Sequence, residues 1–174
     1  MKLHTLIPAD AIATRVGELG RALAAELAGE PVLMVGVLTG GVVFLADLIR
    51  AMPDQPMEIE FLAARSYAGT ESTGTVHITQ DLSSPITDRH VVLVEDIVDT
   101  GLTLTRIREA LLARQPRSLR VVTLLDKPSR RRVPFTPDWV GFEIEDRFVV
   151  GYGLDLDGAY RNLPYVGELV SDEV

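Results

Sequence analysis

The chain has 174 residues, enough for one domain over residues 1–174, and its 47% hydrophobic and 24% charged content is ordinary for a soluble globular protein. It contains no cysteine, which excludes disulfides, thiolate metal sites and thiol nucleophiles. Its formal charge of −8 argues against general nucleic-acid binding. The sequence has no signal-peptide pattern and no apolar run of membrane-spanning length, so we expect a cytoplasmic protein that has no membrane partner.

The first part of the chain alternates between helical and strand-like patterns. Near the N-terminus, apolar residues such as Ile12, Val16 and Leu19 recur at helical spacing. A nearly continuous apolar run of strand length follows, and Gly40 and Gly41 end it before a second helical segment. The predicted elements are a helix over 8–28, a strand over 31–38, a helix over 42–52, a strand over 57–65 and a mobile loop over 66–74.

The alternation continues through the next segments. The predicted elements are strands over 75–82 and 91–96, a helix over 102–114, and strands over 118–127 and 139–145. In the basic link between the last two strands, we expect Arg130 to Arg132 to form a solvated turn. Strands that alternate with helices predict right-handed βαβ units, and therefore an α/β protein with a parallel sheet.

The segment 91–103 combines residue types that suit a ligand site. A strand of apolar residues ends in Glu95 and Asp96, and a short turn with Thr100 and Gly101 leads into a helix. Ligands of open α/β sheets bind beyond the carboxyl ends of the strands, and a helix start favours a phosphate. Two adjacent carboxylates suit ribose hydroxyls or a Mg²⁺ ion. The plainer alternative, a capped helix after a buried strand with surface carboxylates, is disfavoured by the whole combination.

Better-known phosphate motifs do not explain this segment, because the chain has no GxxxxGK[ST] sequence and residues 151–158 lack the third glycine of GxGxxG. VVLVEDIVDTG instead resembles the motif with which type I phosphoribosyltransferases bind phosphoribosyl pyrophosphate (PRPP). The wider chain resembles the hypoxanthine (hypoxanthine-guanine) branch of that family. The ordered matches are LTGG at 38–41, SY at 66–67, the motif at 91–101, LLDK at 124–127 and the segment 138–169.

The resemblance implies a fold, a reaction and a set of partners. The implied fold is a central, mostly parallel sheet flanked by helices, with a small hood built from the terminal segments and a lid loop over about 66–74. The implied activity is purine salvage: transfer of the 5-phosphoribosyl group from PRPP to hypoxanthine, and also to guanine, to form IMP or GMP and pyrophosphate. Mg²⁺ is the implied cofactor, and a homodimer or homotetramer is the implied assembly.

The resemblance also assigns residues to PRPP. Glu95 and Asp96 are implied to bind the ribose hydroxyls, directly or through Mg²⁺. Asp99 lies where the family's proposed general base faces N7 of the purine. The residues implied to hold the 5′-phosphate are Asp99, Thr100, Gly101, Leu102 and Thr103.

Pyrophosphate is implied to bind a second loop together with the lid. Residues 38–41 match the family's pyrophosphate loop, which carries a cis peptide at its second residue. Many relatives have a basic residue where this chain has Thr39, so we expect backbone contacts at that position. The implied pyrophosphate ligands are Leu38, Thr39, Gly40, Ser66, Tyr67 and Arg161.

The implied purine pocket comes from the last third of the chain. Lys127 matches a lysine that donates to the exocyclic oxygen at C6, and Phe148 matches an aromatic residue that stacks on the base, with Ile97 on the opposite face. The implied purine ligands are Ile97, Lys127, Phe148, Val149 and Asp155, and the implied metal ligands are Glu95, Asp96 and Asp155.

Two alternatives stay open at this point. One is a phosphoribosyltransferase for another base, such as xanthine or uracil; Lys127 and Phe148 favour a 6-oxopurine but do not decide the group at C2. The other is a regulator of PRPP fold that binds nucleotide and RNA, for which a basic face is expected and a charge of −8 gives no support.

Overall fold

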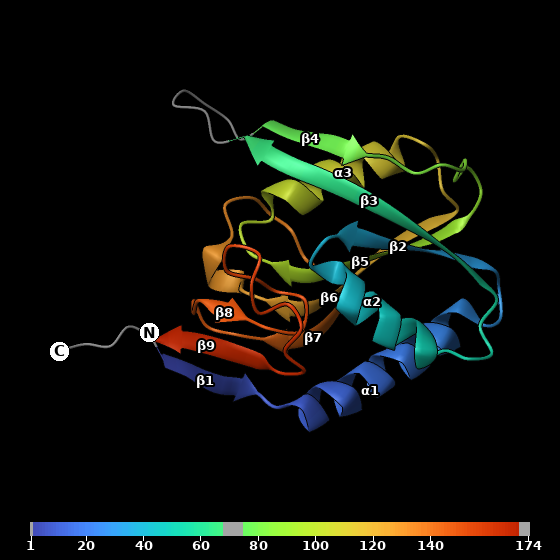
Figure 1. The fold of residues 1–174 in the computed structure, drawn as a ribbon. Coiled ribbons are helices and arrows are strands. Elements are labelled where there is room, and N and C mark those ends of the chain that lie inside the picture. Colours follow the sequence, from blue (N-terminus) through green and yellow to red (C-terminus); the bar gives the residue numbers. More distant parts are fainter. Residues whose placement is uncertain (1, 68–74, 171–174) are drawn as a thin grey trace.

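The computed structural model describes residues 2–67 and 75–170, and within them two sheets organise the chain (Figure 1). The larger sheet is parallel except at its β3–β4 edge. In spatial order its strands are β4 (Thr75–Gln80), β3 (Met57–Tyr67), β2 (Val32–Leu38), β5 (His90–Val98), β6 (Ser118–Asp126) and β7 (Trp139–Glu143). The predicted α/β class with a mostly parallel central sheet is therefore confirmed.

Helices cover both faces of this sheet. Figure 1 shows α1 (Ala9–Leu27) and α2 (Gly41–Arg50) on one face and α3 (Leu102–Leu112) on the other, while the short 3₁₀ helix η1 (Pro128–Arg130) follows β6. The α-helices α1, α2 and α3 start and end within two residues of the ranges that their apolar spacing predicts, whereas η1 was not predicted. Among the described residues, no helix has both the length and the hydrophobicity needed to cross a membrane.

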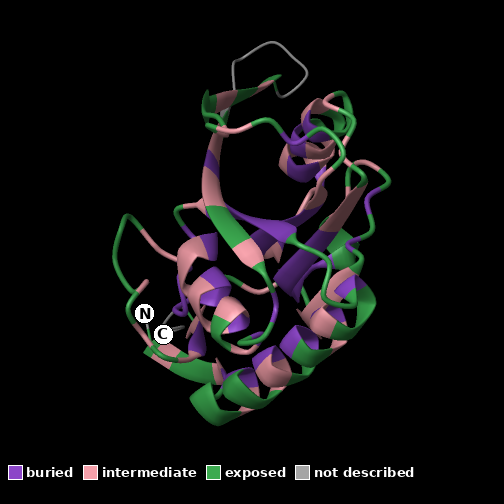
Figure 2. Cartoon of the chain, turned by 90° about the vertical axis from the view of Figure 1, so that its right-hand side faces the viewer, coloured by how far each residue is buried: buried purple, intermediate pink, exposed green. Residues whose placement is uncertain are grey.

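The apolar runs of the central strands reflect burial on both faces. In β2, Met34 belongs to the core beneath α1 and α2, whereas Leu33 and Val35 belong to the core beneath α3, and all three are fully buried. A parallel strand covered on both faces has no solvent side, so its sequence is continuously apolar rather than alternating. Figure 2 shows this burial concentrated in the central strands and along one side of the helices.

A second, antiparallel sheet joins the two ends of the chain. Its order is β1 (Lys2–Ile7), β9 (Val166–Val170) and β8 (Val149–Val150). The prediction by apolar pattern did not find these strands, because β1 and β9 are partly exposed and β8 has only two residues. Phe148 directly precedes β8, so this sheet is connected to one of the candidate site residues.

The prediction of a loop over 66–74 can be compared with the structure at its first two residues. Ser66 and Tyr67 are the last residues of β3, where they pair with β4, so the prediction of a loop is wrong for these two residues. Residues 68–74 lie outside the described residues.

The strand that carries Glu95 and Asp96 also extends beyond its predicted end. It continues to Val98, because Ile97 and Val98 pair with β6. Glu95 and Asp96 are therefore held within the sheet, and Asp99 is the first residue after it.

The packing of α3 gives a prediction with a matched control. Leu111 is fully buried, whereas the adjacent Leu112 is 51% exposed. Because truncating a buried leucine removes packing and leaves a cavity, Leu111→Ala should lower the free energy of unfolding by about 2–5 kcal/mol. Leu112→Ala should change it by no more than about 0.5 kcal/mol. Chemical denaturation measures both, and equal losses would contradict the orientation of α3 described above.

Candidate active site

The carboxyl ends of β5 and β6 bring candidate residues of two segments together. The strands run parallel with Val98 opposite Asp126, so Asp99 and Lys127 begin neighbouring loops. The backbone N–H of Lys127 donates to the Val98 carbonyl at 2.9 Å and joins the two loops where they leave the sheet.

The carboxylates of Glu95 and Asp96 are held close to the backbone. Glu95 is buried, and its Oε1 accepts the Asp96 N–H at 2.9 Å. Asp96 Oδ1 accepts the Ile97 N–H at 2.7 Å. Asp96 Oδ2 lies against Gly40, where a Cβ atom would be only 1.6 Å away. Glycine is therefore required at this position as long as Asp96 keeps its orientation.

Burial is the main influence on the ionisation of this pair. It raises the pKa of Glu95 well above the usual range, and the adjacent charge of Asp96 raises it further. Burial also raises the pKa of Asp96, although hydrogen bonds from Glu95 and from the Ile97 N–H, and the charge of Arg161, act in the opposite direction. The two carboxylates therefore lack a full counter-charge in the ligand-free protein.

The Glu95–Asp96 pair is suited to supply the protein ligands of a Mg²⁺ site. Mg²⁺ usually takes one or two protein carboxylates and completes its octahedral shell with substrate phosphates and water. In the described part of the chain, no three His, Cys, Asp or Glu side chains form a group that would hold a metal ion. Asp155 is engaged elsewhere, since it accepts the Gly158 N–H at 2.8 Å and pairs with Arg161 at 2.9 Å. The structure thus does not gather the three predicted metal ligands into one cluster.

The loop after β5 turns into α3 through Gly101, whose φ of +82° lies in the left-handed region that favours glycine. Thr100 Oγ1 accepts the Leu102 N–H at 3.3 Å, and the Thr105 N–H donates to the Gly101 carbonyl at 3.0 Å. N–H groups in the first turn of a helix have no helical partner and are suited to an anion. A cavity of about 160 Å³ opens here, lined by Glu95, Ile97, Val98, Asp99, Thr100, Gly101, Thr103 and Leu104.

A second loop, at the end of β2, lies beside Asp96. The Leu38–Thr39 peptide is cis, as the resemblance implied, and Gly40 leads into α2. Gly153 packs against this loop, because a Cβ atom there would lie 2.2 Å from the Gly40 carbonyl oxygen. Arg161 Nη1 donates to the Gly153 carbonyl at 2.6 Å. The predicted pyrophosphate ligands of this loop and Arg161 are thus connected through one glycine.

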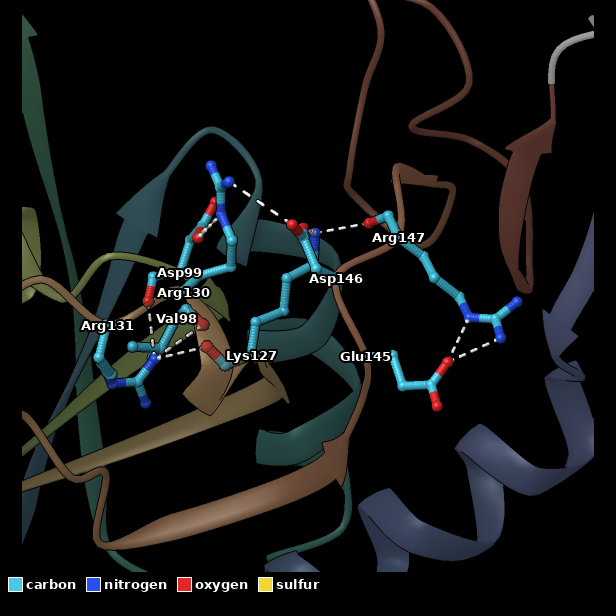
Figure 3. Close-up of polar contacts among 8 residues, drawn as sticks. All are labelled: Val98, Asp99, Lys127, Arg130, Arg131, Glu145, Asp146 and Arg147. Carbon is cyan, nitrogen blue, oxygen red and sulfur yellow. Dashed lines mark hydrogen bonds and ion pairs between the residues drawn. The ribbon is translucent and has the colours of Figure 1, made fainter.

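A chain of ion pairs joins the loops after β5, β6 and β7 (Figure 3). Arg130 pairs with Asp99 at 3.1 Å and with Asp146 at 3.5 Å. Asp146 in turn lies 3.8 Å from Lys127 Nζ, which donates to the Arg147 carbonyl at 2.5 Å. Other groups of the protein therefore bond both Asp99 and Lys127.

An exposed aromatic residue directly follows Arg147, whose carbonyl accepts from Lys127 Nζ. Phe148 is 54% exposed, although its carbonyl is fixed by the Leu169 N–H of β9 at 3.0 Å. Val149, which follows it, is buried, and Ile97 is half-buried. A large exposed ring on a fixed backbone is suited to stacking on a planar ligand.

Arg131 corrects the predicted solvated turn. Its side chain is only 16% exposed and donates to backbone carbonyls of both loops, so the prediction is wrong for this residue. Arg130 is also engaged, through its ion pairs, whereas Arg132 is exposed as expected. Three consecutive arginines look alike in sequence, and only the path of the loop distinguishes them.

Comparisons with known proteins agree on one family. Residues 7–157 match the model of the phosphoribosyl transferase domain. The hypoxanthine phosphoribosyltransferase of Haemophilus influenzae is 44% identical over 180 residues, which cover 99% of this chain and 100% of the relative. A solved hypoxanthine-guanine phosphoribosyltransferase from Bacillus anthracis has a TM-score of 0.91 at 42% identity, covering 95% of this chain and 98% of that one. The Trypanosoma cruzi hypoxanthine phosphoribosyltransferase, solved with the product IMP, has a TM-score of 0.90 at 40% identity, covering 95% and 93%.

Glu95→Gln tests the cost of burying this carboxylate without a ligand. Because folding raises the pKa of Glu95, the folded chain binds the proton more tightly than the unfolded chain. Stability is therefore lost as pH rises from the unfolded-state pKa, about 4.3, through the raised folded-state value. Glu95→Gln should raise the melting temperature of the ligand-free protein at pH 8 and flatten that decline. Calorimetric scans from pH 4 to 8 measure both effects.

The matched control is Glu143→Gln, at an exposed glutamate of β7. It should leave the pH dependence as in the wild type. A Glu95→Gln protein that melts below the wild type at pH 8 would refute the proposed burial cost.

Proposed function

The chain belongs to the hypoxanthine and hypoxanthine-guanine phosphoribosyltransferases, and on this premise we propose that the ends of β5 and β6 form its catalytic site. The reaction moves the 5-phosphoribosyl group of PRPP to hypoxanthine, and also to guanine, and yields IMP or GMP and pyrophosphate. The observation that carries the assignment of the site is that Asp99 and Lys127 begin neighbouring loops, and that Lys127 Nζ bonds the carbonyl of Arg147, the residue directly before the exposed Phe148. A carboxylate, a lysine and an aromatic face together suit a planar base with an oxygen acceptor and a proton to lose.

PRPP is assigned to the loops around Asp96. The 5′-phosphate would bind residues 99–103, where the start of α3 supplies N–H groups and the Thr100 and Thr103 hydroxyls supply further donors. Glu95 and Asp96 would accept hydrogen bonds from the ribose hydroxyls. Pyrophosphate would bind residues 38–40 and Arg161, together with Ser66 and Tyr67 at the end of β3.

The purine is assigned to the loops after β6 and β7. Lys127 Nζ would donate to the C6 oxygen of the base, Phe148 would stack on one face, and Ile97 would lie against the other. The backbone of Val149 would bond the edge of the base, near Asp155. Binding would replace the protein partners of Lys127 and Asp99, so the Arg130–Asp146 ion pairs would rearrange when the base enters.

The proposed reaction follows from this placement. The bond from C1′ to the pyrophosphate oxygen breaks through an oxocarbenium-like transition state, and its electron pair leaves with pyrophosphate. N9 of the purine forms the new bond to C1′ from the opposite face, and Asp99 accepts the proton from N7. Most of the acceleration would come from orienting the two substrates and from fixed donors around the leaving group.

Glu95 and Asp96 are the residues that would hold Mg²⁺, because they form the buried pair without a full counter-charge. A divalent cation at this position would offset the negative charge of the pyrophosphate. Asp155 would join the metal site only if it released its bonds to Gly158 and Arg161.

Further proposals concern the domain, the cellular location and the assembly of the protein. Residues 1–174 are proposed to act as one domain, in which the sheet of β1, β9 and β8 is the hood and the segment around 66–74 is the lid. The absence of cysteine supports a reducing, cytoplasmic setting. The family resemblance supports a homodimer or homotetramer.

A panel of bases tests the proposed function. With PRPP and Mg²⁺, the protein should form nucleotide from hypoxanthine and guanine, and the rates with xanthine, adenine and uracil define its selectivity. Lys127→Met should lower kcat/KM for hypoxanthine by about 10–100-fold, because it removes one charge-assisted hydrogen bond, with little change in the KM for PRPP.

Lys2→Met is the matched control, since Lys2 is the other lysine of the sequence and lies in β1. It should keep the kinetics of the wild type. A wild-type protein that forms no nucleotide from any purine would overturn the proposed function.

A further inference from the structure

Arg131 is bonded through every nitrogen of its side chain. Nη1 donates to three carbonyl oxygens, at 2.8 Å to Asp99, at 3.2 Å to Val98 and at 3.3 Å to Lys127. These carbonyls belong to the last residue of β5, to the first residue after it and to the first residue after β6, so one nitrogen contacts both halves of the site (Figure 3).

The other two nitrogens, Nε and Nη2, bond two further groups and hold the guanidinium in place. Nε donates to the Phe135 carbonyl at 2.9 Å, and Nη2 donates to the carboxylate of Asp126, a residue that is only 7% exposed. A charge-assisted bond to a buried carboxylate is stronger than a neutral one and fixes the plane of the fork. The guanidinium therefore has one orientation, set by groups outside the loops that bind the substrates.

The segment around Arg131 also packs directly against residues 99–103, the loop assigned to the 5′-phosphate. The Arg132 N–H donates to the Thr100 carbonyl at 2.9 Å. A Cβ atom on Gly101 would lie 3.0 Å from Phe135 Cβ and 3.4 Å from Arg131 Cδ. The loop thus lies against residues 131–135 with no space between them.

We propose that Arg131 is a positioning residue that fixes the separation between Asp99 and Lys127, an inference that rests on the proposed function. It contacts no substrate group assigned above, and its bonds go to the backbone next to both side chains. A lysine cannot replace it, because an ammonium offers its donors from one point, whereas the planar fork reaches the three carbonyls and the carboxylate together.

The expected effect is on turnover. A displacement of about 1 Å in a reacting group can cost about 100-fold in rate, so Arg131→Lys should lower kcat for IMP formation by about 10–100-fold. The KM for PRPP should change by less than about threefold, because α3 and the bond from the Arg132 N–H to the Thr100 carbonyl still hold residues 100–103. The control is Arg132→Lys, at the adjacent exposed arginine, and it should keep wild-type kcat.

A double-mutant cycle with Asp99→Asn separates positioning from general damage. If Arg131 acts by placing Asp99, Arg131→Lys should cost much less in the Asp99→Asn background than in the wild type. A general loss of structure would lower kcat by the same factor in both backgrounds, and that result would overturn the proposal.

Asp126→Asn gives an independent test, even if Arg131→Lys fails to fold. It keeps the size of the side chain but removes the charge that orients the guanidinium, so kcat should fall by about 3–10-fold and the same cycle should be non-additive. If the wild type is active and kcat is unchanged in Asp126→Asn or in a folded Arg131→Lys protein, the positioning role of Arg131 is overturned and the proposed function stands. An inactive wild type would instead overturn the proposed function.

Discussion

The parallel pairing of β5 with β6 is the constraint on which the rest of the site depends. Its register sets Val98 opposite Asp126, so the loops after the two strands start side by side and share a 2.9 Å backbone hydrogen bond. Helices on both faces bury these strands, which leaves little freedom at their carboxyl ends. The separation of Asp99 and Lys127 is therefore set by the sheet, and Arg131 extends that control into the loops.

The charges of the proposed site are compatible with an anionic substrate, although the chain as a whole is acidic. A net charge of −8 is compatible with phosphate binding because the donors are local: the first turn of α3, the loop at 38–40 and Arg161. Glu95 and Asp96 oppose such a ligand unless a cation accompanies it, and burial makes their charge costly in its absence. In the proposed site, the carboxylate pair would thus connect substrate binding to the binding of a divalent ion.

Sequence patterns predicted the helices and the strands of the larger sheet, because apolar runs, alternation and helical spacing follow from burial against the core. They did not find β1 and β9, whose partly exposed residues show no clear period, and they placed Ser66 and Tyr67 in a loop although pairing with β4 keeps them in β3. The candidate ligands were named through ordered motif matches. The partners Arg130, Arg131 and Asp146 were not, since their contacts depend on how two loops meet.

A crystal structure of the protein with bound IMP would test this account most directly. We expect the 5′-phosphate to lie at the start of α3 against residues 100–103. We also expect the base to stack on Phe148, with its C6 oxygen within hydrogen-bonding distance of Lys127 Nζ. IMP bound with its phosphate at another helix, or with its base away from Lys127 and Phe148, would contradict the assignment of the site to the ends of β5 and β6.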